Sequence, residues 1–105
     1  MNRFMRMIIC FDLPTVTYLD MVNYRRFRKF LIKNGFVMMQ ESVYSKLVMN
    51  RNSLSLIKKR VAENLPTNGN IQLIEITEKQ FAGIEYLRGR AQKRVVDSEK
   101  RVIEI

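Results

Sequence analysis

The chain has 105 residues, of which 47% are hydrophobic and 28% charged, and its 19 Lys and Arg against 10 Asp and Glu give a formal charge of +9. This length suits one domain with a two-layer core, and no segment reaches the roughly 18 to 20 uncharged apolar residues of a membrane span, so we expect a cytoplasmic protein without a membrane contact. The absence of histidine excludes histidine-based nucleophile pairs and histidine-ligated zinc, and it leaves oxygen ligands for any metal, which favours Mg²⁺ or Mn²⁺.

The first predicted strand, residues 5–11, is a mostly apolar run that ends on Asp12, where Leu13 and Pro14 interrupt it. This pattern indicates a buried strand that carries one carboxylate to the edge of a sheet. The single cysteine, Cys10, has no internal disulfide partner. We therefore interpret it as a small buried hydrophobe.

A helix is predicted next; it ends at Asn34, and Gly35 supplies the left-handed position that terminates it. Thr15, Thr17 and Asp20 are the candidates for its N-terminal cap. At 100° per residue, four apolar side chains fall on one arc and four cations on the opposite arc. The apolar arc, which we expect to face the sheet, holds Tyr24, Phe27, Phe30 and Leu31, and the cationic arc holds Arg25, Arg26, Lys29 and Lys33.

A pair of strands is predicted at residues 36–40 and 43–49. The join at Glu41 and Ser42 fits either a tight turn or a bulge in one long strand. An RRM-like sheet would use an aromatic such as Tyr44 to stack a base, but the strand lacks the Gly-Phe signature of that fold. We therefore interpret Tyr44 as a packing residue.

The second half of the chain predicts a helix, a strand and a short helix. The first helix is capped by Ser53, and its buried stripe consists of Leu54, Ile57, Val61 and Leu65. A strand at 71–76 comes next, and Thr77 with Gln80 fits a capping box over a short helix at 78–82. The remaining tail holds two candidate strands, at 84–87 and 101–105.

This order of elements is that of a ferredoxin-like α+β sandwich (βαββαβ), in which both helices cover one face of an antiparallel sheet. We predict this domain at 1–82 and a tail at 83–105, whose C-terminal extra strand takes part in dimer or partner contacts. Several strands are apolar on both sides, which would leave a large apolar patch on the uncovered face. We expect a second subunit to cover it.

The positive charge is concentrated between Asp20 and Glu63, where Glu41 is the only acid. The same stretch holds Arg25, Arg26, Arg28, Lys29, Lys33, Lys46, Arg51, Lys58, Lys59 and Arg60. Such a distribution favours a polyanionic partner, above all a nucleic acid. The alternatives are a cationic surface kept for solubility and a helix lying on a membrane, which is less suitable because the core needs the apolar side.

Asp12 admits two interpretations. An aspartate before Leu-Pro is commonly a turn residue whose side chain caps nearby backbone amides. A metal site normally needs two or more carboxylates, and no sequence neighbour supplies the second. Two protomers packed sheet to sheet about a two-fold axis would supply it, with one Asp12 from each on a hydrated Mg²⁺.

Four segments of the chain, in this order and at this spacing, resemble a known family. They are FDLP at 11–14, YRRFRKFL at 24–31, GFVMMQESVY at 35–44 and TEKQF at 77–81. Together they are similar to the second CRISPR-associated core protein family (Cas-two), in the form that accompanies type II systems. The similarity covers nearly the whole chain.

The resemblance implies a ferredoxin-like homodimer that lies between two dimers of the Cas-one integrase and helps to capture foreign DNA as new spacers. Family members have also been described as metal-dependent nucleases that act on RNA or double-stranded DNA. Asp12 matches the position of the aspartate that holds Mg²⁺ across the dimer in those members. The nuclease role is not uniform within the family.

The predicted function is therefore a dimeric double-stranded-DNA-binding subunit of the CRISPR spacer acquisition (adaptation) complex, which bridges integrase dimers through phosphate contacts without base readout. The predicted contacts are Arg25, Arg26, Lys29 and Lys33 and, in the tail, Arg88, Arg90, Lys93 and Arg94. One alternative is a Mg²⁺-dependent endonuclease with Asp12 as its catalytic and metal-binding residue. The other is a free-standing RNA-binding or toxin-like protein of the same fold.

Overall fold

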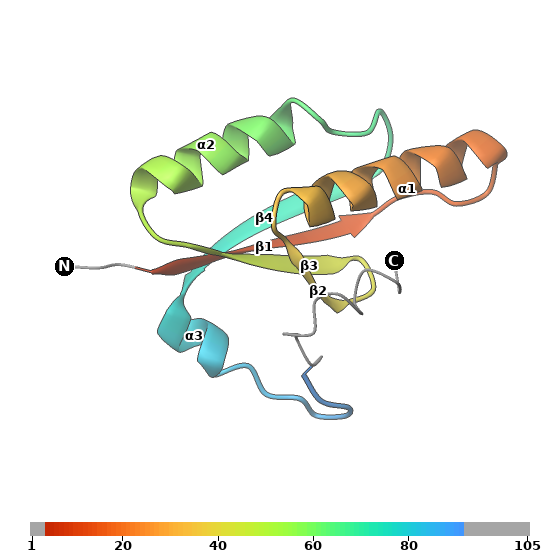
Figure 1. Cartoon of the computed structure of the whole chain (residues 1–105). Coiled ribbons are helices and arrows are strands. Elements are labelled where there is room, and N and C mark those ends of the chain that lie inside the picture. The colour runs from red at the N-terminus through yellow and green to blue at the C-terminus, as the bar shows by residue number, and fades with distance from the viewer. Residues whose placement is uncertain (1–3, 92–105) are drawn as a thin grey trace.

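A four-stranded antiparallel sheet carries two helices on one face and a short third helix on the other (Figure 1). The computed structural model describes residues 4–91. Its elements in chain order are β1 (Met5–Asp12), α1 (Tyr18–Lys33), β2 (Val37–Gln40), β3 (Val43–Val48), α2 (Arg51–Ala62), β4 (Asn70–Thr77) and α3 (Glu78–Ala82). In the strand order β2-β3-β1-β4, the connection from β1 through α1 to β2 skips β3, and the connection from β3 through α2 to β4 skips β1. The predicted ferredoxin-like fold is confirmed.

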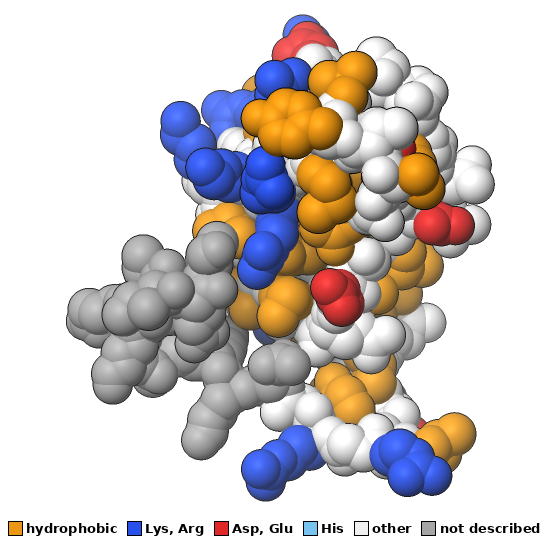
Figure 2. All heavy atoms as spheres, turned by 90° about the vertical axis from the view of Figure 1, so that its right-hand side faces the viewer, with side chains coloured by type: hydrophobic (Ala, Val, Ile, Leu, Met, Phe, Trp, Pro, Cys, Tyr) orange, Lys and Arg blue, Asp and Glu red, His pale blue; other side chains and the backbone are white. Residues whose placement is uncertain are grey.

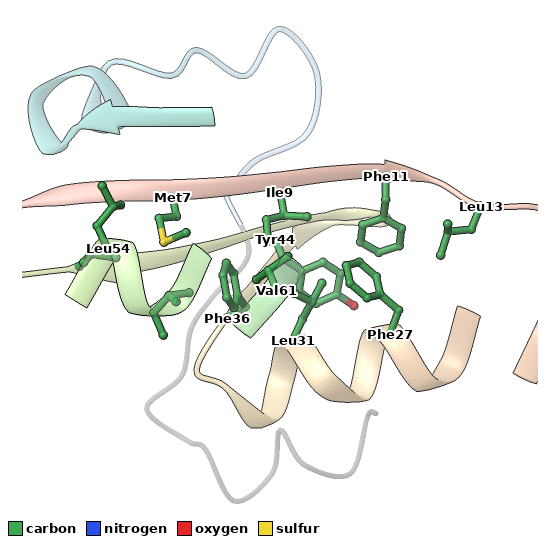
Figure 3. Close-up of a cluster of buried hydrophobic side chains, with 12 residues drawn as sticks. Met7, Ile9, Phe11, Leu13, Phe27, Leu31, Phe36, Tyr44, Leu54 and Val61 are labelled. Atoms are coloured by element: carbon green, nitrogen blue, oxygen red, sulfur yellow. The ribbon is translucent and has the colours of Figure 1, made fainter. Parts of the chain in front are cut away.

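The core lies between the sheet and the two long helices. β1 pairs with β3 on one side and with β4 on the other, and its alternate residues from Met7 to Leu13 point toward the helices (Figure 3). They pack on Phe27 and Leu31, which are buried in α1, as the apolar arc predicted. The four cations of the opposite arc, Arg25, Arg26, Lys29 and Lys33, consequently lie on the side of the helix away from the sheet.

Thr17 is the N-cap of α1, and Asp20 completes a capping box with it. The Asp20 amide donates to the Thr17 hydroxyl, and the Thr17 amide donates to the Asp20 carboxylate, each at 3.0 Å. These hydrogen bonds, above all the one from the Thr17 amide, lower the pKa of Asp20. Of the three predicted candidates, Thr15 has no part in this cap.

The prediction that Ser53 caps α2 is wrong. Asn50 is the cap, and its side-chain oxygen accepts a hydrogen bond of 2.8 Å from the Ser53 amide. Asn and Ser both cap helices well. Because Asn50 is the cap, the helix begins at Arg51, three residues earlier than a Ser53 cap would allow. The assignment of Leu65 to the buried stripe is also wrong, because the helix ends at Ala62 and leaves this residue outside. After the end of α2, the Asn64 side chain donates to the Arg60 carbonyl at 2.8 Å, so one of the last carbonyls of the helix has a hydrogen-bond partner.

Two further predictions concern connections. The join of β2 and β3 contains both a turn and a bulge, since Ser42 has a φ of +66° and the register shifts between Met38 and Gln40. The candidate strand at 84–87 is wrong, because the Ile84 amide bonds to the Phe81 carbonyl at 3.2 Å in the closing turn of α3 and none of the described strands pairs with residues 85–87. The candidate strand at 101–105 lies outside the described residues, and the 1–82 boundary stays a prediction.

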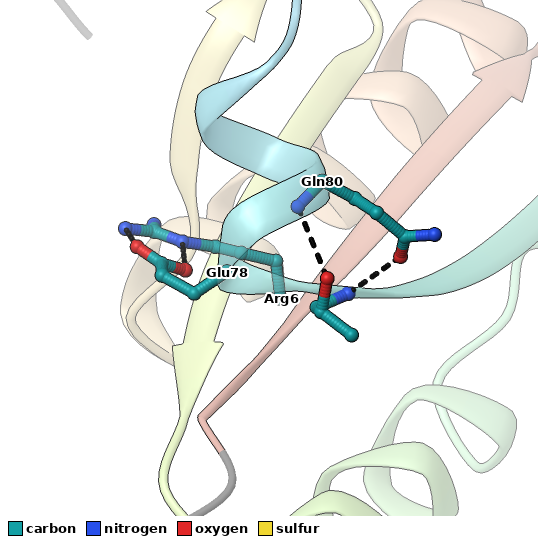
Figure 4. Close-up of polar contacts among 4 residues, drawn as sticks. Arg6, Glu78 and Gln80 are labelled. Atoms are coloured by element: carbon teal, nitrogen blue, oxygen red, sulfur yellow. Dashed lines mark hydrogen bonds and ion pairs between the residues drawn. The ribbon is translucent and has the colours of Figure 1, made fainter.

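The sheet face opposite α1 and α2 is partly covered by α3. Arg6 holds this helix: its Nε and Nη2 atoms donate to the two carboxylate oxygens of Glu78 at 2.8 and 3.0 Å (Figure 4). Its guanidinium carbon also lies 4.2 Å from the centre of the Phe81 ring. The Thr77 and Gln80 capping box that begins α3 is confirmed. The rest of this face carries the exposed apolar side chains Val37, Leu47 and Ile74, as the doubly apolar strands predicted.

Candidate functional site

The cationic arc of α1 is exposed along the helix. Arg25, Arg26, Lys29 and Lys33 are all exposed, and Figure 2 shows Lys and Arg side chains gathered on the upper part of the face beside α1. The ion pairs within residues 4–91 are Arg6–Glu78 and Lys58–Glu75, so none of these neutralises an α1 cation. The helix therefore presents positive charge to solvent.

Arg28 is a fifth cation of α1, and its environment differs. It is partly buried, and its Nε donates to the hydroxyl of Tyr44 at 3.0 Å. The Tyr44 side chain is buried, and its ring stacks on Phe11 with centroids 5.8 Å apart, which confirms its interpretation as a packing residue. Burial raises the pKa of Tyr44, and the hydrogen bond from Arg28 opposes that rise.

Arg28 is not among the predicted nucleic-acid contacts. Its position four residues after Tyr24, at the border between the apolar and cationic arcs, is the sequence signal that could have identified it. The Tyr24 hydroxyl lies 3.3 Å from the Ser42 hydroxyl. Arg28 thus reaches from α1 to β3, and Tyr24 reaches from α1 to the turn before β3.

The second predicted group of cations lies elsewhere. Arg88 and Arg90 are exposed and belong to the segment after α3, which runs on the opposite side of the sheet from α1 (Figure 1). The structure does not bring them together with the α1 cations within one chain. Lys93 and Arg94 lie outside the described residues.

Asp12 is the last residue of β1, exposed and paired with Asn70 of β4. Because strand residues alternate, its side chain belongs to the face opposite Phe11, which is the α3 face. Residues paired directly across an antiparallel ladder share a face, so Asn70 is its nearest cross-strand neighbour and Gln72 lies one pair further. Sequence reasoning missed these two side-chain amides, although Asn70 and Gln72 alternate with the apolar Ile71 and Leu73 along β4.

The Asp12 carboxylate makes none of the side-chain hydrogen bonds found within residues 4–91. The backbone amides just before α1 bond to Asp20 instead: its carboxylate accepts from the Val16 amide at 3.2 Å and from the Thr17 amide at 3.0 Å. The turn-capping role that was one interpretation of Asp12 thus belongs to Asp20. Among residues 4–91, no side-chain hydrogen bond or ion pair occupies the Asp12 carboxylate.

A glycine fixes the end of β1. Gly69 has a φ of +92°, and a Cβ atom built on it would lie 2.7 Å from the Asp12 carbonyl oxygen. Only glycine allows both this conformation and this approach. The loop before β4 is therefore packed directly against the backbone of Asp12.

The donor set around Asp12 suits a hard cation only in part. A carboxylate and neighbouring amide oxygens are ligand types that Mg²⁺ accepts while it keeps several waters. Within the described part of the chain, however, no three His, Cys, Asp or Glu side chains lie together as a metal-binding group. A single protomer thus offers one charged ligand, and the second carboxylate would have to come from another copy.

The fold and these surfaces define a small ferredoxin-like protein with a basic helix on one layer and the exposed Asp12 carboxylate on the opposite sheet face. No helix among residues 4–91 has the length and apolar character needed to cross a membrane. The family model of CRISPR associated protein Cas2 matches residues 5–84. The chain belongs to this family, which is the Cas-two family of the sequence resemblance.

Similar proteins cover nearly the whole chain. The CRISPR-associated endoribonuclease Cas2 of Streptococcus mutans serotype c is 46% identical over 99 residues, which span 94% of this chain and 91% of that protein. The protein of the same name from Treponema denticola is 41% identical over 99 residues, 94% of this chain and 98% of its own. That from Lacticaseibacillus rhamnosus is 37% identical over 101 residues, 96% of this chain and 100% of its own.

Proposed function

We propose that this protein is a dimeric subunit of the CRISPR spacer acquisition complex that binds double-stranded DNA and bridges dimers of the Cas-one integrase. The exposed cations of α1, which have no ion pair within residues 4–91, support the DNA-binding role most directly. The apolar side of α1 is occupied by the core, so the opposite side is free to contact a large polyanion.

The geometry of α1 favours backbone contacts over base readout. The cations of α1 extend from Arg25 to Lys33, about 12 Å of helix, and duplex DNA carries one charge per about 1.7 Å of its axis. Several phosphates therefore lie within reach of cations placed on successive turns. Contacts of this kind position a duplex without reading its sequence, which suits a subunit that handles DNA of any sequence.

The dimer is supported by the opposite face of the sheet. Val37, Leu47 and Ile74 are 39 to 43% exposed there, and a second copy of the chain is the occupant we propose. A two-fold axis through this face would place one basic α1 on each outer side of the assembly. Static light scattering should report twice the mass of one chain. A monomer at micromolar concentration would refute the bridging role.

The DNA-binding surface is tested by the salt dependence of affinity for a mixed-sequence duplex. The double variant Arg25→Ala with Lys29→Ala should lower the slope of log affinity against log salt by about 1.8. The matched control is Arg51→Ala with Lys59→Ala, which removes the same charge from exposed positions of α2. Equal changes in both variants would indicate a net-charge effect and contradict a site on α1. Co-purification with the integrase tests the bridging role.

A Mg²⁺-dependent endonuclease is the second candidate function. It is supported by the names of the relatives, which describe endoribonucleases, and by the exposed Asp12 at the end of β1. Asp12, one from each protomer, would hold the metal, with Asn70 beside it on the same face. When bound, the metal would polarise a phosphate and activate a water. Mn²⁺ is the other cation that such oxygen ligands accept.

Asp12→Asn separates the two functions because it keeps the shape of the side chain and removes its charge. Cleavage of RNA and of duplex DNA is measured with Mg²⁺, with Mn²⁺ and with a chelator. Nuclease function predicts chelator-sensitive cleavage that the variant loses while its dimer mass and duplex affinity persist. Cleavage that survives in the variant would exclude Asp12 as the catalytic residue.

A further inference from the structure

We propose that Arg28 is the phosphate-gripping residue of α1 and that Tyr44 is the positioning residue that holds its guanidinium ready. This inference rests on the proposed DNA binding and names the contact that contributes most to it. The observation behind it is the 3.0 Å hydrogen bond from Arg28 Nε to the Tyr44 hydroxyl.

Tyr44 is a rigid anchor. Its side chain is 1% exposed, and its backbone lies in the middle of the sheet, between Ile9 of β1 and Met38 of β2. The ring stacks on Phe11, so the hydroxyl has little freedom to move. A donor bound to this hydroxyl is consequently held in a defined place relative to the sheet.

Arg28 keeps most of its binding capacity. A guanidinium has five N–H donors, and the hydrogen bond to Tyr44 uses the single one on Nε. Within residues 4–91 neither Nη group has a hydrogen bond or an ion pair. Two adjacent Nη groups form the fork that binds phosphate oxygens in a bidentate manner.

The comparison with other cations of the chain shows why this arrangement matters. Arg6, the other partly buried arginine with a fixed guanidinium, is neutralised by Glu78. Arg25 and Lys29 have no ion pair within residues 4–91 but are exposed, so binding must first restrict their long side chains. Arg28 combines a fixed position with a charge that no acid among the described residues neutralises. Restricting its side chain in advance lowers the entropy lost on binding.

Neutral donors lie between α1 and the turn before β3. The Tyr24 ring packs edge-on against Phe11, the ring on which Tyr44 also stacks. The Tyr24 hydroxyl lies 3.3 Å from the Ser42 hydroxyl. Ser42 in turn accepts the Phe11 amide through its carbonyl at 3.0 Å. The Tyr24 hydroxyl is thus held through the same ring as Tyr44, and it adds a neutral donor to the surface between α1 and β3.

The test is a double-mutant cycle on the full chain, read as affinity for a mixed-sequence DNA duplex over a range of salt concentrations. Tyr44→Phe keeps the ring and the charge of Arg28 but removes the anchor. We expect it to weaken binding about three- to tenfold and to leave the salt slope unchanged. Arg28→Ala should lower the slope by about 0.9, and Tyr44→Phe should have no further effect in that background.

Arg25→Ala is the matched control, since it removes an exposed charge from the same helix. It should lower the salt slope by a similar amount, while Tyr44→Phe keeps its full effect in that background. Equal effects of Tyr44→Phe with and without Arg28 would overturn the inference, because they would indicate a structural role only. An unchanged slope in Arg28→Ala would overturn it as well.

A second measurement needs no substitution. Arginine modification by phenylglyoxal, mapped by mass spectrometry on the unaltered chain, should be slowed at Arg28 by bound duplex. Equal modification with and without duplex would contradict the inference. If the unaltered chain binds no duplex, the proposed function fails and this inference with it; binding that persists without any contribution of Arg28 overturns the inference alone.

Discussion

Three glycines in left-handed conformations differ in their surroundings, and this difference predicts three different responses to alanine. Their φ angles are alike, +91° at Gly35, +92° at Gly69 and +84° at Gly89. A Cβ on Gly69 would meet the Asp12 carbonyl oxygen at 2.7 Å and a side-chain atom of Leu13 at 2.5 Å. A Cβ on Gly35 would meet only the end of the Lys46 side chain, and one on Gly89 would meet nothing within 4 Å.

The magnitude is obtained by separating backbone strain from steric contact. A left-handed alanine costs about 1–2 kcal/mol relative to glycine, and this is the whole effect expected at Gly89. At Gly35 the mobile lysine end moves aside, so the same range applies. At Gly69 the opposing carbonyl belongs to the backbone of a central strand and cannot rotate away, so we expect a loss of at least about 3 kcal/mol of unfolding free energy.

Thermal unfolding measures the ranking. For a domain of this size about 1 kcal/mol corresponds to 4–8 °C, so Gly69→Ala should melt at least about 10 °C below the parent protein and clearly below Gly89→Ala. Equal melting temperatures for Gly69→Ala and Gly89→Ala would mean that the loop moves away from Asp12 without cost. That result would refute the argument that Gly69 fixes the end of β1.

Substitutions at three other places, one with a matched control, test the fold. Leu31→Ala should lower the unfolding free energy by about 2–5 kcal/mol in urea denaturation, since this side chain is fully buried, whereas Leu19→Ala, at an exposed position, should change it by less than about 0.5 kcal/mol. Arg6→Ala should cost about 0.5–1.5 kcal/mol by the same measurement, a discounted figure because Glu78 is partly exposed; no loss would show that α3 does not depend on the pair. The folded-state pKa of Asp20 is lowered, so its contribution to stability is present above its ordinary pKa of about 4 and is lost as the pH falls through the folded value. Asp20→Asn should therefore flatten the pH dependence of the melting temperature below about pH 5, and an unchanged pH profile would exclude this contribution.

The strongly periodic parts of the fold could be predicted from the sequence. The spacing of Phe27 and Leu31 placed the buried side of α1 correctly, because one amphipathic helix on one sheet leaves little choice of orientation. The run that ends on Asp12 placed β1, and Thr77 with Gln80 identified the start of α3. In each of these cases the pattern is local, and the tertiary structure uses it unchanged.

The errors concern places where several local solutions compete. Asn50 and Ser53 are both good caps, and sequence alone does not say which one the helix uses. The segment 84–87 has strand-forming residues, but a strand also needs a neighbour with free backbone groups, and none of the described strands supplies one. The Arg28–Tyr44 contact joins residues 16 apart in sequence, so it depends on the helix crossing over β3.

The two proposed functions use different layers of the molecule. Asp12 belongs to the sheet face that carries α3, and the cations of α1 lie outside the opposite layer, with the core between them (Figure 1). A duplex that lies along α1 of one chain is therefore separated from the Asp12 of that chain by the thickness of the domain. Substitutions at the two sites should act independently, because residues without shared partners have additive effects. Under the proposed functions, this separation allows DNA binding on α1 without a metal site at Asp12, and it makes cleavage depend on a substrate that reaches the sheet face which carries Asp12.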